Sequence, residues 1–529
     1  MFKTVLILLA VFGATSLYAY QGTAERIHAD QYGIWSETAT GQFLNIHSPE
    51  PIQNPPEVLW HYSLETGMQQ KCCPMGYNCD FVFTGGWYGG AVMFQGKTGD
   101  GTPQWNYEPQ TYSDWTSLGT GTCAAKTQDV FFAVQNWDSK AANTAVMCFE
   151  SSSSTPLWIW SDPSFNSGAV DSPGKFACSD DGAVFAVGGV TNGHLAIHFF
   201  SPGSSTPFAS YENTDIQYSP RQLRITSDGS KCIFRVSATL YRVDTATGTL
   251  EAQYALDASN DCFGISPDGS VVAYGFTAAR IAVWNGSEYQ LSAGTAVSGY
   301  YGGAAAVAAD NNTVYFGFYK NTYKTNRIIR FDLNAGSVSW TYDYPAGSGG
   351  YQDVMKWMEC TPDGRWMVAG SWGCENGGGD EVNVFYDLYP ESPVFSIDTP
   401  GSISHVDISP DGRYITASGK HVHANQMGSG TDVYMGEVYF MGTGGSEPVN
   451  LAVSVYPNPA QGAFSVNAVL PETGSGVLNI YDFAGRCVYE TPVAGSGQIA
   501  VSEELPAGVY NCLLNSSAGT AAARIVLID

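Results

Sequence analysis

The sequence is short of basic residues and of charge in general. Lysine and arginine number 23 against 49 aspartates and glutamates, and charged residues make up only 14% of the 529 positions. The formal net charge is therefore -26. A surface with this balance repels phosphate backbones and anionic lipid headgroups. We therefore expect neither nucleic acid nor acidic membranes as partners.

Long apolar runs are scarce as well. The most apolar stretch, residues 5–12, falls well short of the roughly 20 residues that span a bilayer, so we expect no transmembrane segment. Lys3 precedes this stretch, and Ala19 is a small residue before a candidate cleavage point at Tyr20. This pattern predicts a signal peptide over residues 1–19 and an exported protein.

A nucleophile motif is also missing. The sequence has no α/β-hydrolase region with a Gly-x-Ser-x-Gly elbow, and the nearest string, residues 369–373, places Ser371 at the end of an expected strand. We therefore interpret Ser371 as a strand or turn residue and predict no catalytic residue.

Twelve cysteines form an even set, which is compatible with disulfides in an oxidising exterior. The adjacent residues Cys72 and Cys73 lie close in sequence to Cys79. We expect one of the pair to close a small local loop with Cys79.

What the sequence has in quantity is glycine, proline and apolar residues, with 60 glycines, 26 prolines and 44% hydrophobic positions. This composition indicates a globular, turn-rich protein with a sizeable core. Five segments share an apolar strand that runs into an Asp-Gly turn: Phe176-Ala-Cys-Ser-Asp-Asp181-Gly182, Leu223-Arg-Ile-Thr-Ser-Asp228-Gly229, Phe263-Gly-Ile-Ser-Pro-Asp268-Gly269, Met358-Glu-Cys-Thr-Pro-Asp363-Gly364 and Val406-Asp-Ile-Ser-Pro-Asp411-Gly412.

The turn chemistry predicts a hairpin at each of these segments. Aspartate closes a local bond to the backbone, and glycine takes the positive φ that reverses the chain. Weaker copies at Asp80, Asp129 and Asn311 bring the markers to eight, spaced 40 to 52 residues apart. A period of roughly 40 to 50 residues made only of strands predicts a β-propeller over residues 20–445.

Eight blades are favoured, and seven are the alternative. Residues 57–63 match the fourth strand of a blade but precede the first marker. We therefore expect the segment around residues 58–62 to pair as an outer strand beside residues 437–440, which would close the ring and remove its free edges.

The blade period ends in a linker at residues 446–452, after which short strands separated by glycine, proline and serine fill residues 453–529. About seven strands in this length predict a small immunoglobulin-like β-sandwich. The whole chain is thus expected to be all-β.

Two resemblances follow from these motifs. The Ser-Pro-Asp-Gly turns resemble WD-repeat-like propellers of bacterial envelope proteins. A Thr-Gly turn followed by an aromatic strand, as in Thr98-Gly99 before Trp105, is similar to pyrroloquinoline-quinone-type blades. The second resemblance implies an alternative role for Cys72 and Cys73, the vicinal disulfide of some quinoprotein dehydrogenases. The quinone-binding and metal-binding residues of that family have no counterparts that we can place here.

The C-terminal region resembles the sorting domain of type IX secretion in Bacteroidetes. The motifs that carry the resemblance are Tyr456-Pro457-Asn458-Pro459, Ile480-Tyr481-Asp482, Leu505-Pro506-Ala507-Gly508-Val509-Tyr510 and the terminal Arg524-Ile525-Val526-Leu527. The resemblance implies the secretion machinery as a partner, passage through the outer membrane, and removal of the domain with release or attachment to surface lipopolysaccharide. An ordinary immunoglobulin-like stalk is the alternative.

Candidate ligand-contacting residues are aromatic. Loops of the expected propeller carry Trp87, Tyr88, Trp115, Tyr300, Tyr301 and Trp372. Such rings could stack on glycans or peptides, and packing between blades is the alternative for each of them.

No cofactor is expected, although two metal options exist. His405, His421 and His423 could bind zinc if their imidazoles converged. Calcium is the second option, because Asn376, Asp380 and Glu381 offer oxygens in a glycine-rich loop. The alternative to zinc is that these histidines are hydrogen-bonded surface residues. The alternative to calcium follows from the spacing of the oxygen ligands, which does not match an EF-hand.

The sequence favours a secreted or cell-surface propeller that binds or scaffolds an extracellular glycan or protein. The alternative is a quinoprotein-like oxidoreductase or a polysaccharide-acting propeller enzyme. A deep central site with carboxylates of perturbed pKa would favour the enzyme.

Overall fold

The structure is a computed structural model of an all-β chain, and it describes most of the sequence. The described residues are 26–30, 33–37, 43–47, 56–438 and 452–527, less gaps at 88, 108–117, 138–143, 169–173, 258–261, 321, 323, 350–352, 388–389, 424–429, 457–463, 471–474, 482–485, 495–496, 502–504 and 517–518. Their regular structure consists of strands and one short 3-10 turn, η1 (Tyr77–Cys79). The expected signal peptide lies outside these ranges.

Contacts along the chain divide it into two compact units, one of residues Pro55–Phe440 and one of Met1–Asn54 with Met441–Asp529. We call the first the sheet unit. Before it, the described residues form a three-stranded sheet of β1 (Arg26–Asp30), β2 (Gly33–Glu37) and β3 (Phe43–His47). The boundaries expected at 20–445 and 453–529 stay predictions, and residues 446–451 of the expected linker are outside the described ranges.

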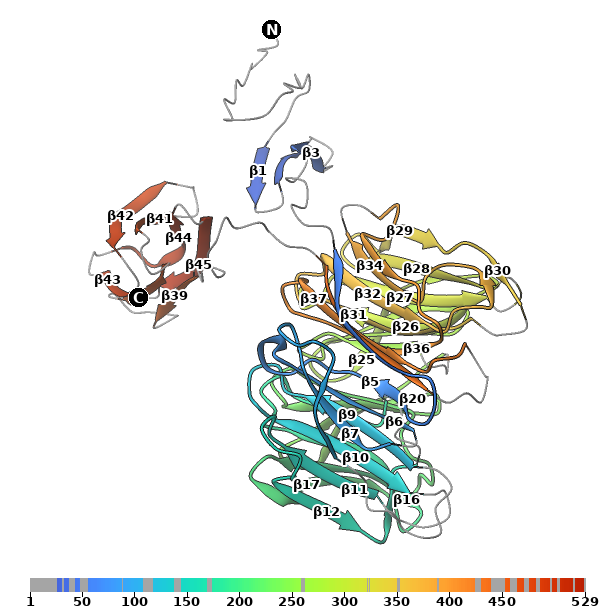
Figure 1. Cartoon of the computed structure of the whole chain (residues 1–529). Coiled ribbons are helices and arrows are strands. Elements are labelled where there is room, and N and C mark those ends of the chain that lie inside the picture. Colours follow the sequence, from blue (N-terminus) through green and yellow to red (C-terminus); the bar gives the residue numbers. More distant parts are fainter. Residues whose placement is uncertain are drawn as a thin grey trace. The chain divides into compact units, whose positions relative to one another are not determined.

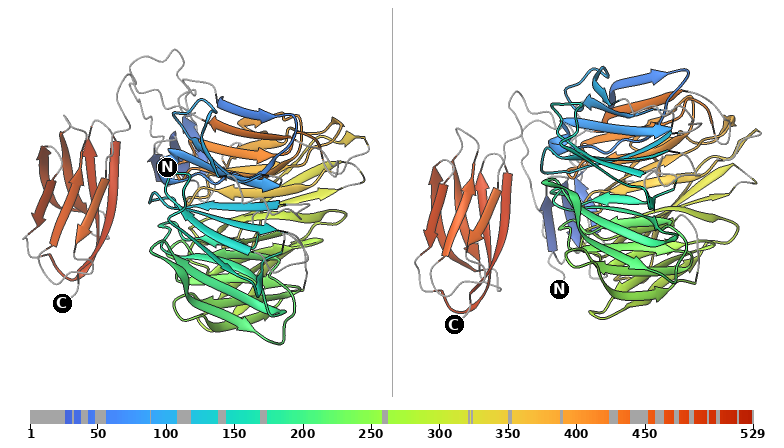
Figure 2. Two further views of the ribbon diagram at one scale, coloured as in Figure 1. Left: turned by 60° about the horizontal axis from the view of Figure 1, so that its bottom comes forward. Right: turned by 90° about the horizontal axis from the view of Figure 1, so that it is seen from below.

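We divide the described strands of the sheet unit into eight antiparallel groups of four, which we call sheets 1 to 8 (Figures 1 and 2). Sheets 1 and 2 are joined into one eight-stranded sheet by the pairing of Trp87 with Gly119. Sheet 1 contains β5 (Gln69–Cys72), β6 (Phe81–Trp87), β7 (Ala91–Gln95) and β8 (Pro103–Tyr107), and sheet 2 contains β9 (Leu118–Ala124), β10 (Phe131–Trp137), β11 (Thr144–Phe149) and β12 (Trp158–Asp162). Sheet 3 contains β14 (Phe176–Cys178), β15 (Phe185–Thr191), β16 (His194–Ser201) and β17 (Ser204–Asn213), and sheet 4 contains β18 (Gln222–Ile225), β19 (Lys231–Val236), β20 (Thr239–Asp244) and β21 (Thr249–Ala255).

Sheets 5 to 8 repeat the arrangement. Sheet 5 contains β22 (Cys262–Ile265), β23 (Val271–Gly275), β24 (Ala278–Trp284) and β25 (Tyr289–Ala296), and sheet 6 contains β26 (Tyr301–Val307), β27 (Thr313–Lys320), β28 (Thr325–Asp332) and β29 (Ser337–Asp343). Sheet 7 contains β31 (Met355–Cys360), β32 (Trp366–Ser371), β34 (Val382–Tyr386) and β35 (Phe395–Ile397), and sheet 8 contains β36 (Ile403–Ile408), β37 (Tyr414–Gly419), β38 (Thr431–Glu437) and β4 (Glu57–Leu64). Three short strands lie outside these groups, β13 (Phe165–Asn166), which pairs with β15, and β30 (Gly347–Ser348), which pairs with β33 (Asn376–Gly377).

The N-terminal strand β4 completes sheet 8, whose other strands come from the far end of the sheet unit. It pairs antiparallel with β38 from Glu57↔Glu437 to Leu64↔Thr431. Figure 2 shows this blue strand beside orange ones. β4 pairs with β38 as the expected outer strand, but residues 58–62 lie opposite Val433 to Gly436 and not opposite residues 437–440.

Apolar cores fill the spaces between consecutive sheets, including the space between the last and the first. Trp60 and Met435 of sheet 8 share a core with Val82 and Phe94 of sheet 1. The Trp60 indole donates a hydrogen bond to the Gly96 carbonyl at 2.8 Å, and its ring lies 5.4 Å from that of Phe94. The first strands also contact one another in the order β5, β9, β14, β18, β22, β26, β31 and β36, and β36 contacts β5.

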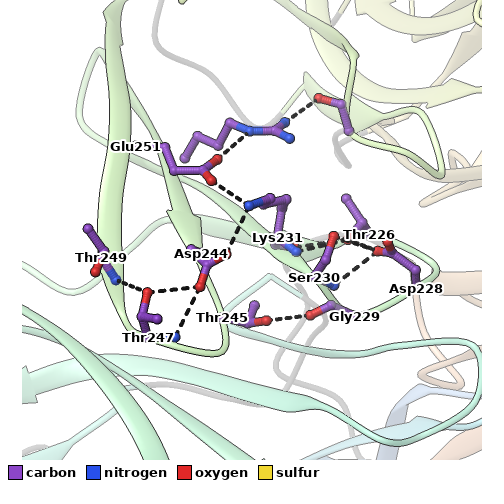
Figure 3. Close-up of polar contacts among 12 residues, drawn as sticks. Thr226, Asp228, Gly229, Ser230, Lys231, Asp244, Thr245, Thr247, Thr249 and Glu251 are labelled. Atoms are coloured by element: carbon purple, nitrogen blue, oxygen red, sulfur yellow. Dashed lines mark hydrogen bonds and ion pairs between the residues drawn. The ribbon is translucent and has the colours of Figure 1, made fainter. Parts of the chain in front are cut away.

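The Asp-Gly turns have the hydrogen bonds that the sequence predicts. In sheet 5 the Asp268 carboxylate accepts the Ser266 hydroxyl at 2.6 Å and the Ser270 amide at 2.9 Å. Gly269 has a φ of +68°, a left-handed value that favours glycine. Figure 3 shows the equivalent turn of sheet 4 around Asp228. The same bonds recur at Asp181, Asp363 and Asp411.

Backbone bonds join consecutive turns. The Lys126 amide donates to the Asp180 carbonyl at 2.7 Å, the Asp180 amide to Ser227 at 3.0 Å, and the Ser227 amide to Pro267 at 2.7 Å. An equivalent bond joins sheet 6 to sheet 7. These bonds place the turns on one edge of the sheet unit, which we call the turn edge. The other ends of the same strands form the opposite edge.

The C-terminal unit has two sheets around one core. The described strands are β39 (Ala452–Tyr456), β40 (Phe464–Val469) and β43 (Gly497–Val501) in one sheet, and β42 (Cys487–Ala494), β41 (Ser475–Tyr481), β44 (Gly508–Ser516) and β45 (Gly519–Leu527) in the other. Phe464 and Val501 from the first sheet pack with Leu478 and Ile525 from the second.

All twelve cysteines are free thiols, so the expected disulfide between Cys79 and Cys72 or Cys73 is not formed in the structure. The three lie on or beside sheet 1, but their side chains enter different cores. Cys72 packs in the core between sheets 2 and 3, whereas Cys73 and Cys79 pack in the core between sheets 8 and 1. Alternation along the strand explains why the adjacent pair point apart.

Candidate functional site

Charged side chains occupy one position of the repeated strand in three sheets. The second residue of the repeat is Arg224 in sheet 4, Glu359 in sheet 7 and Asp407 in sheet 8, whereas the residues on either side of it are mostly apolar. These side chains gather with three others in what we call the cross-sheet cluster: Lys126, Arg224, Trp357, Glu359, His405 and Asp407.

Asp407 anchors one half of this cluster. Its Oδ2 accepts a hydrogen bond from the Met75 amide at 2.8 Å and forms an ion pair with the Lys126 ammonium. The ammonium also donates to the Met75 carbonyl at 3.1 Å. The other carboxylate oxygen accepts the amide of Ile408 at 2.9 Å. Asp407 is thus fully engaged within the protein, and its charge is balanced by Lys126.

The other half joins side chains from sheets that are not neighbours along the chain. The Arg224 guanidinium lies 4.5 Å from the centroid of the Trp357 ring, although sheets 5 and 6 come between their own sheets in the chain. The Trp357 indole donates a hydrogen bond to Glu359 Oε1 at 2.9 Å. The Trp357 ring also lies 5.1 Å from that of His405. With Lys126, which follows β9 of sheet 2, the cluster therefore joins side chains from four sheets.

Burial shifts the pKa values of this cluster. It raises the pKa of Glu359 to about 7, and the charge of Asp407 acts in the same direction. Burial lowers the pKa of His405 to about 3, so its imidazole is neutral at pH 7. Burial also lowers the pKa of Lys126, but the Asp407 carboxylate outweighs it and leaves the pKa raised. Glu359 is therefore the group whose charge changes near neutral pH.

A second feature lies on the opposite edge. Phe276 follows β23, Tyr301 begins β26 and Tyr319 lies near the end of β27, each at the strand end away from the Asp-Gly turn. The ring of Tyr301 is 5.2 Å from that of Phe276 and 5.9 Å from that of Tyr319. Phe276 and Tyr301 are 40% and 41% exposed. We call these three rings the aromatic patch.

The aromatic residues that the sequence singled out have different surroundings. Tyr301 is in the patch, but Tyr300 is buried, with the Arg327 guanidinium 4.4 Å from its ring centroid. Trp87 ends β6 on the same edge, and the Lys71 ammonium lies 3.4 Å from its ring centroid. Trp372 is half-buried just after β32. Tyr88 and Trp115 lie outside the described residues.

The three histidines proposed for zinc have separate partners. His405 Nδ1 accepts the Cys73 amide at 3.2 Å, His421 bonds to Asp432 at 2.9 Å, and His423 donates to the Trp372 carbonyl at 3.0 Å. Among the described residues, no three His, Cys, Asp or Glu side chains are grouped closely enough to hold a metal ion.

The residues proposed for calcium also differ in their surroundings. Glu381 is buried, its carboxylate accepts the Thr399 amide at 2.7 Å, and burial raises its pKa to about 7. Asn376 is exposed, and Asp380 is half-buried. Ser371, the expected strand residue, is buried as the last residue of β32. The calcium option stays a prediction.

The described part of the sorting motif forms one hairpin. Gly508 and Tyr510 on β44 pair with Leu527 and Ile525 on β45. The Tyr510 hydroxyl donates to the Pro506 carbonyl at 2.7 Å, which fixes the turn before the strand. Tyr456 ends β39, while Pro457, Asn458 and Pro459 lie outside the described residues.

Comparison with known proteins decides what this unit is. Residues 454–528 match the family model of the secretion system C-terminal sorting domain. The C-terminal unit is a type IX sorting domain. The protein that carries this sorting domain is therefore secreted or held at the cell surface. No helix in the described ranges has the length and hydrophobicity to cross a bilayer.

Other comparisons concern the rest of the chain. A search of curated proteins found no match. Among solved structures, the chain is similar to hydrazine synthase of Kuenenia stuttgartiensis, with 14% identity and a TM-score of 0.36 over 46% of this chain and 73% of that chain.

Sequence reasoning missed most of the cross-sheet cluster and two members of the aromatic patch. Of the cluster, only His405 was singled out, and as a metal ligand. The available signal was the second repeat position, where Arg224, Glu359 and Asp407 interrupt otherwise apolar strands. Phe276 and Tyr319 have no such signal, because strand ends on different sheets become neighbours only after folding.

Proposed function

We propose that the protein is an extracellular binding protein in which a closed eight-bladed β-propeller presents the aromatic patch to a glycan. The proposal for the ring is supported by β4 within sheet 8, by the core shared between sheets 8 and 1, and by the circuit of first-strand contacts. A closed ring leaves no free sheet edge and holds its loops rigidly. The seven strands of the sorting domain are proposed to have an immunoglobulin-like topology.

The aromatic patch is the observation that carries the proposed function. Two large rings at 40% and 41% exposure, with a third beside them, form an apolar surface. Aromatic rings have flat apolar faces that suit the apolar faces of sugar rings. The net charge of -26 further favours uncharged glycans over polyanions. Polyanions should bind weakly, and added salt should strengthen that binding because it screens the repulsion.

A glycan array probed with the mature protein tests this function, with an extracellular protein array in parallel. The best glycan is then titrated against Tyr301→Ala. We expect affinity to fall about tenfold, equivalent to about 1.4 kcal/mol. Tyr218→Ala is the matched control, because Tyr218 is 73% exposed and lies outside the patch. Equal affinities for the two variants, or binding only to proteins, would contradict the glycan proposal.

A polysaccharide-acting enzyme is the second candidate, favoured by the raised pKa of Glu359 in the cross-sheet cluster. A carboxyl group that titrates near pH 7 can act as a general acid. Incubation of each bound glycan with the protein, followed by chromatography of the products, tests this reading. The quinoprotein alternative requires dye reduction that depends on added quinone and calcium and is lost on replacement of Cys72 and Cys73.

Processing follows from the sorting domain. We propose that the mature protein begins near Tyr20 and ends near Gly445, with the sorting domain removed after export. Mass spectrometry of culture supernatant and cell surface measures both ends. Recovery of mostly full-length chain that retains residues 524–529 would contradict this proposal.

A further inference from the structure

Arg224 makes no ion pair with a carboxylate among the described residues, although the charge of Glu359 acts on it at longer range. Among the described residues, its side chain donates one hydrogen bond, from Nη1 to the Leu223 carbonyl at 3.0 Å, and lies against the Trp357 and Phe263 rings. No carboxylate of the described ranges lies within the 4.0 Å of an ion pair. Six other arginines of the sheet unit have such a partner: Arg242, Arg280, Arg327, Arg330, Arg365 and Arg413.

The charged groups of the cross-sheet cluster leave one positive charge, that of Arg224, unbalanced when Glu359 is protonated. Lys126 and Asp407 neutralise each other through their ion pair. Glu359 is the remaining acid, and its only hydrogen bond within the described residues comes from the Trp357 indole. When Glu359 is protonated, the guanidinium of Arg224 has no counter-ion in the cross-sheet cluster. A buried charge without a partner is costly unless a ligand supplies one.

The cluster is also reachable by solvent. Arg224 and Glu359 are half-buried rather than fully buried, and 28% of the Lys126 side chain is exposed. The three residues lie on or just after first strands, β18, β31 and β9, which contact neighbouring first strands on both sides. Their partial exposure leaves part of each side chain accessible to solvent.

We propose that Arg224, stacked on Trp357, binds a small monocarboxylate in the space between the first strands. The planar guanidinium fork matches a carboxylate with two parallel hydrogen bonds. A single surplus positive charge balances a monoanion, whereas a dianion such as sulfate would leave one negative charge unbalanced. The site is separate from the aromatic patch and does not depend on the proposed glycan function.

Glu359 makes the site dependent on pH. The charged groups that act on it are Asp407 from β36, Lys126 after β9 and Arg224 from β18. His405 lies against the same Trp357 ring, and Cys73 bonds to His405. His405 is neutral and Cys73 is protonated near pH 7, because burial lowers the pKa of the first to about 3 and raises that of the second to about 12. Ionised Glu359 competes with the ligand for Arg224, while neutral Glu359 can donate a hydrogen bond to it.

Isothermal titration calorimetry of the mature protein with sodium glucuronate tests the site. The titration is carried out at pH 6 and at pH 8, at constant ionic strength. A competing group with a pKa of about 7 lowers the affinity about tenfold between these pH values. Arg224→Gln should abolish binding, and Glu359→Gln should bind equally at both pH values. Glucose is the uncharged comparison probe, and sulfate, which is a dianion at both pH values, is the dianionic one.

Arg280→Gln is the matched control, since it removes one positive charge from β24, where Arg280 is paired with Asp257. It should bind glucuronate as the parent does, and so should Tyr301→Ala if the patch and this site are separate. Unchanged binding by Arg224→Gln, or affinity of the parent that does not change with pH, would overturn the proposal. If Arg224→Gln does not fold, the loss of pH dependence in Glu359→Gln decides the matter.

Discussion

The two edges of the sheet unit are built from the ends of the same strands, yet they differ in regularity. On the turn edge, Asp181, Asp228, Asp268, Asp363 and Asp411 make the same bonds to a preceding hydroxyl and a following amide. On the opposite edge, each sheet ends differently, with Phe276, Tyr301 and Trp372 among the residues that close the second strands or begin the first.

This difference separates what the repeat specifies from what it leaves free. The repeated turns of the turn edge need a carboxylate and a glycine at fixed positions to hold their shape, and backbone bonds then join one turn to the next. The opposite edge has no such requirement, so its residues are available for recognition. The same logic holds within the strands, where apolar positions build the cores and the second position is free to hold Arg224, Glu359 or Asp407.

Removal of β4 should have the largest effect, because it disrupts both edges at once. A chain that begins at residue 70 loses the outer strand of sheet 8 and exposes the β38 edge. It also loses Trp60, whose burial alone contributes about 3–5 kcal/mol. Calorimetry should show a much lower melting temperature than a chain that begins at residue 56. Equal melting of the two chains would show that β4 does not close the unit.

Gly269→Ala should destabilise the turn edge by about 2 kcal/mol, since an alanine at φ +68° is strained. A Cβ there would also lie 2.6 Å from Ile233 Cδ1. Gly203→Ala is the control, because a Cβ at that position meets no atom within 4 Å. Urea denaturation of both variants measures the difference. A loss no greater than that of the control would remove the special role of the turn glycine.

Glu359→Gln should stabilise the protein above pH 7 by on the order of 1 kcal/mol. Burial raises the pKa of Glu359 from 4.5 to about 7, so the folded state holds the proton more tightly than the unfolded state. Stability contributed by this group is therefore present below pH 4.5 and is lost as pH rises to about 7. The gain should vanish at pH 4, and a gain that persists there would assign it to packing.

Phe276→Ala on the opposite edge should have the smallest effect on stability, about 0.5 kcal/mol or less, because the side chain is 40% exposed. Its effect on glycan affinity should be far larger. A urea midpoint as low as that of Gly269→Ala would mean that the patch belongs to the scaffold.

The sequence predicted the regular features and could not predict the contacts between distant strands. The Asp-Gly turns follow from local chemistry, and the structure confirms them. The period also predicted that residues 58–62 form an outer strand of the last sheet, which they do, although their partners are Val433 to Gly436 and not residues 437–440. The sorting domain was also predicted from its motifs and is confirmed. The contact of Arg224 with Trp357 joins sheets that lie apart in the chain, and no local pattern reports it.

The comparison of Tyr301→Ala with Asp268→Ala tests the central claim, that recognition belongs to the opposite edge and scaffolding to the turn edge. Both variants are titrated with the glycan that the parent binds, and their urea midpoints are measured. The account predicts that Tyr301→Ala loses about tenfold in affinity, equivalent to about 1.4 kcal/mol, at nearly unchanged stability. Asp268→Ala should lose stability and keep its affinity. The reverse assignment, or loss of affinity in both, would contradict the account.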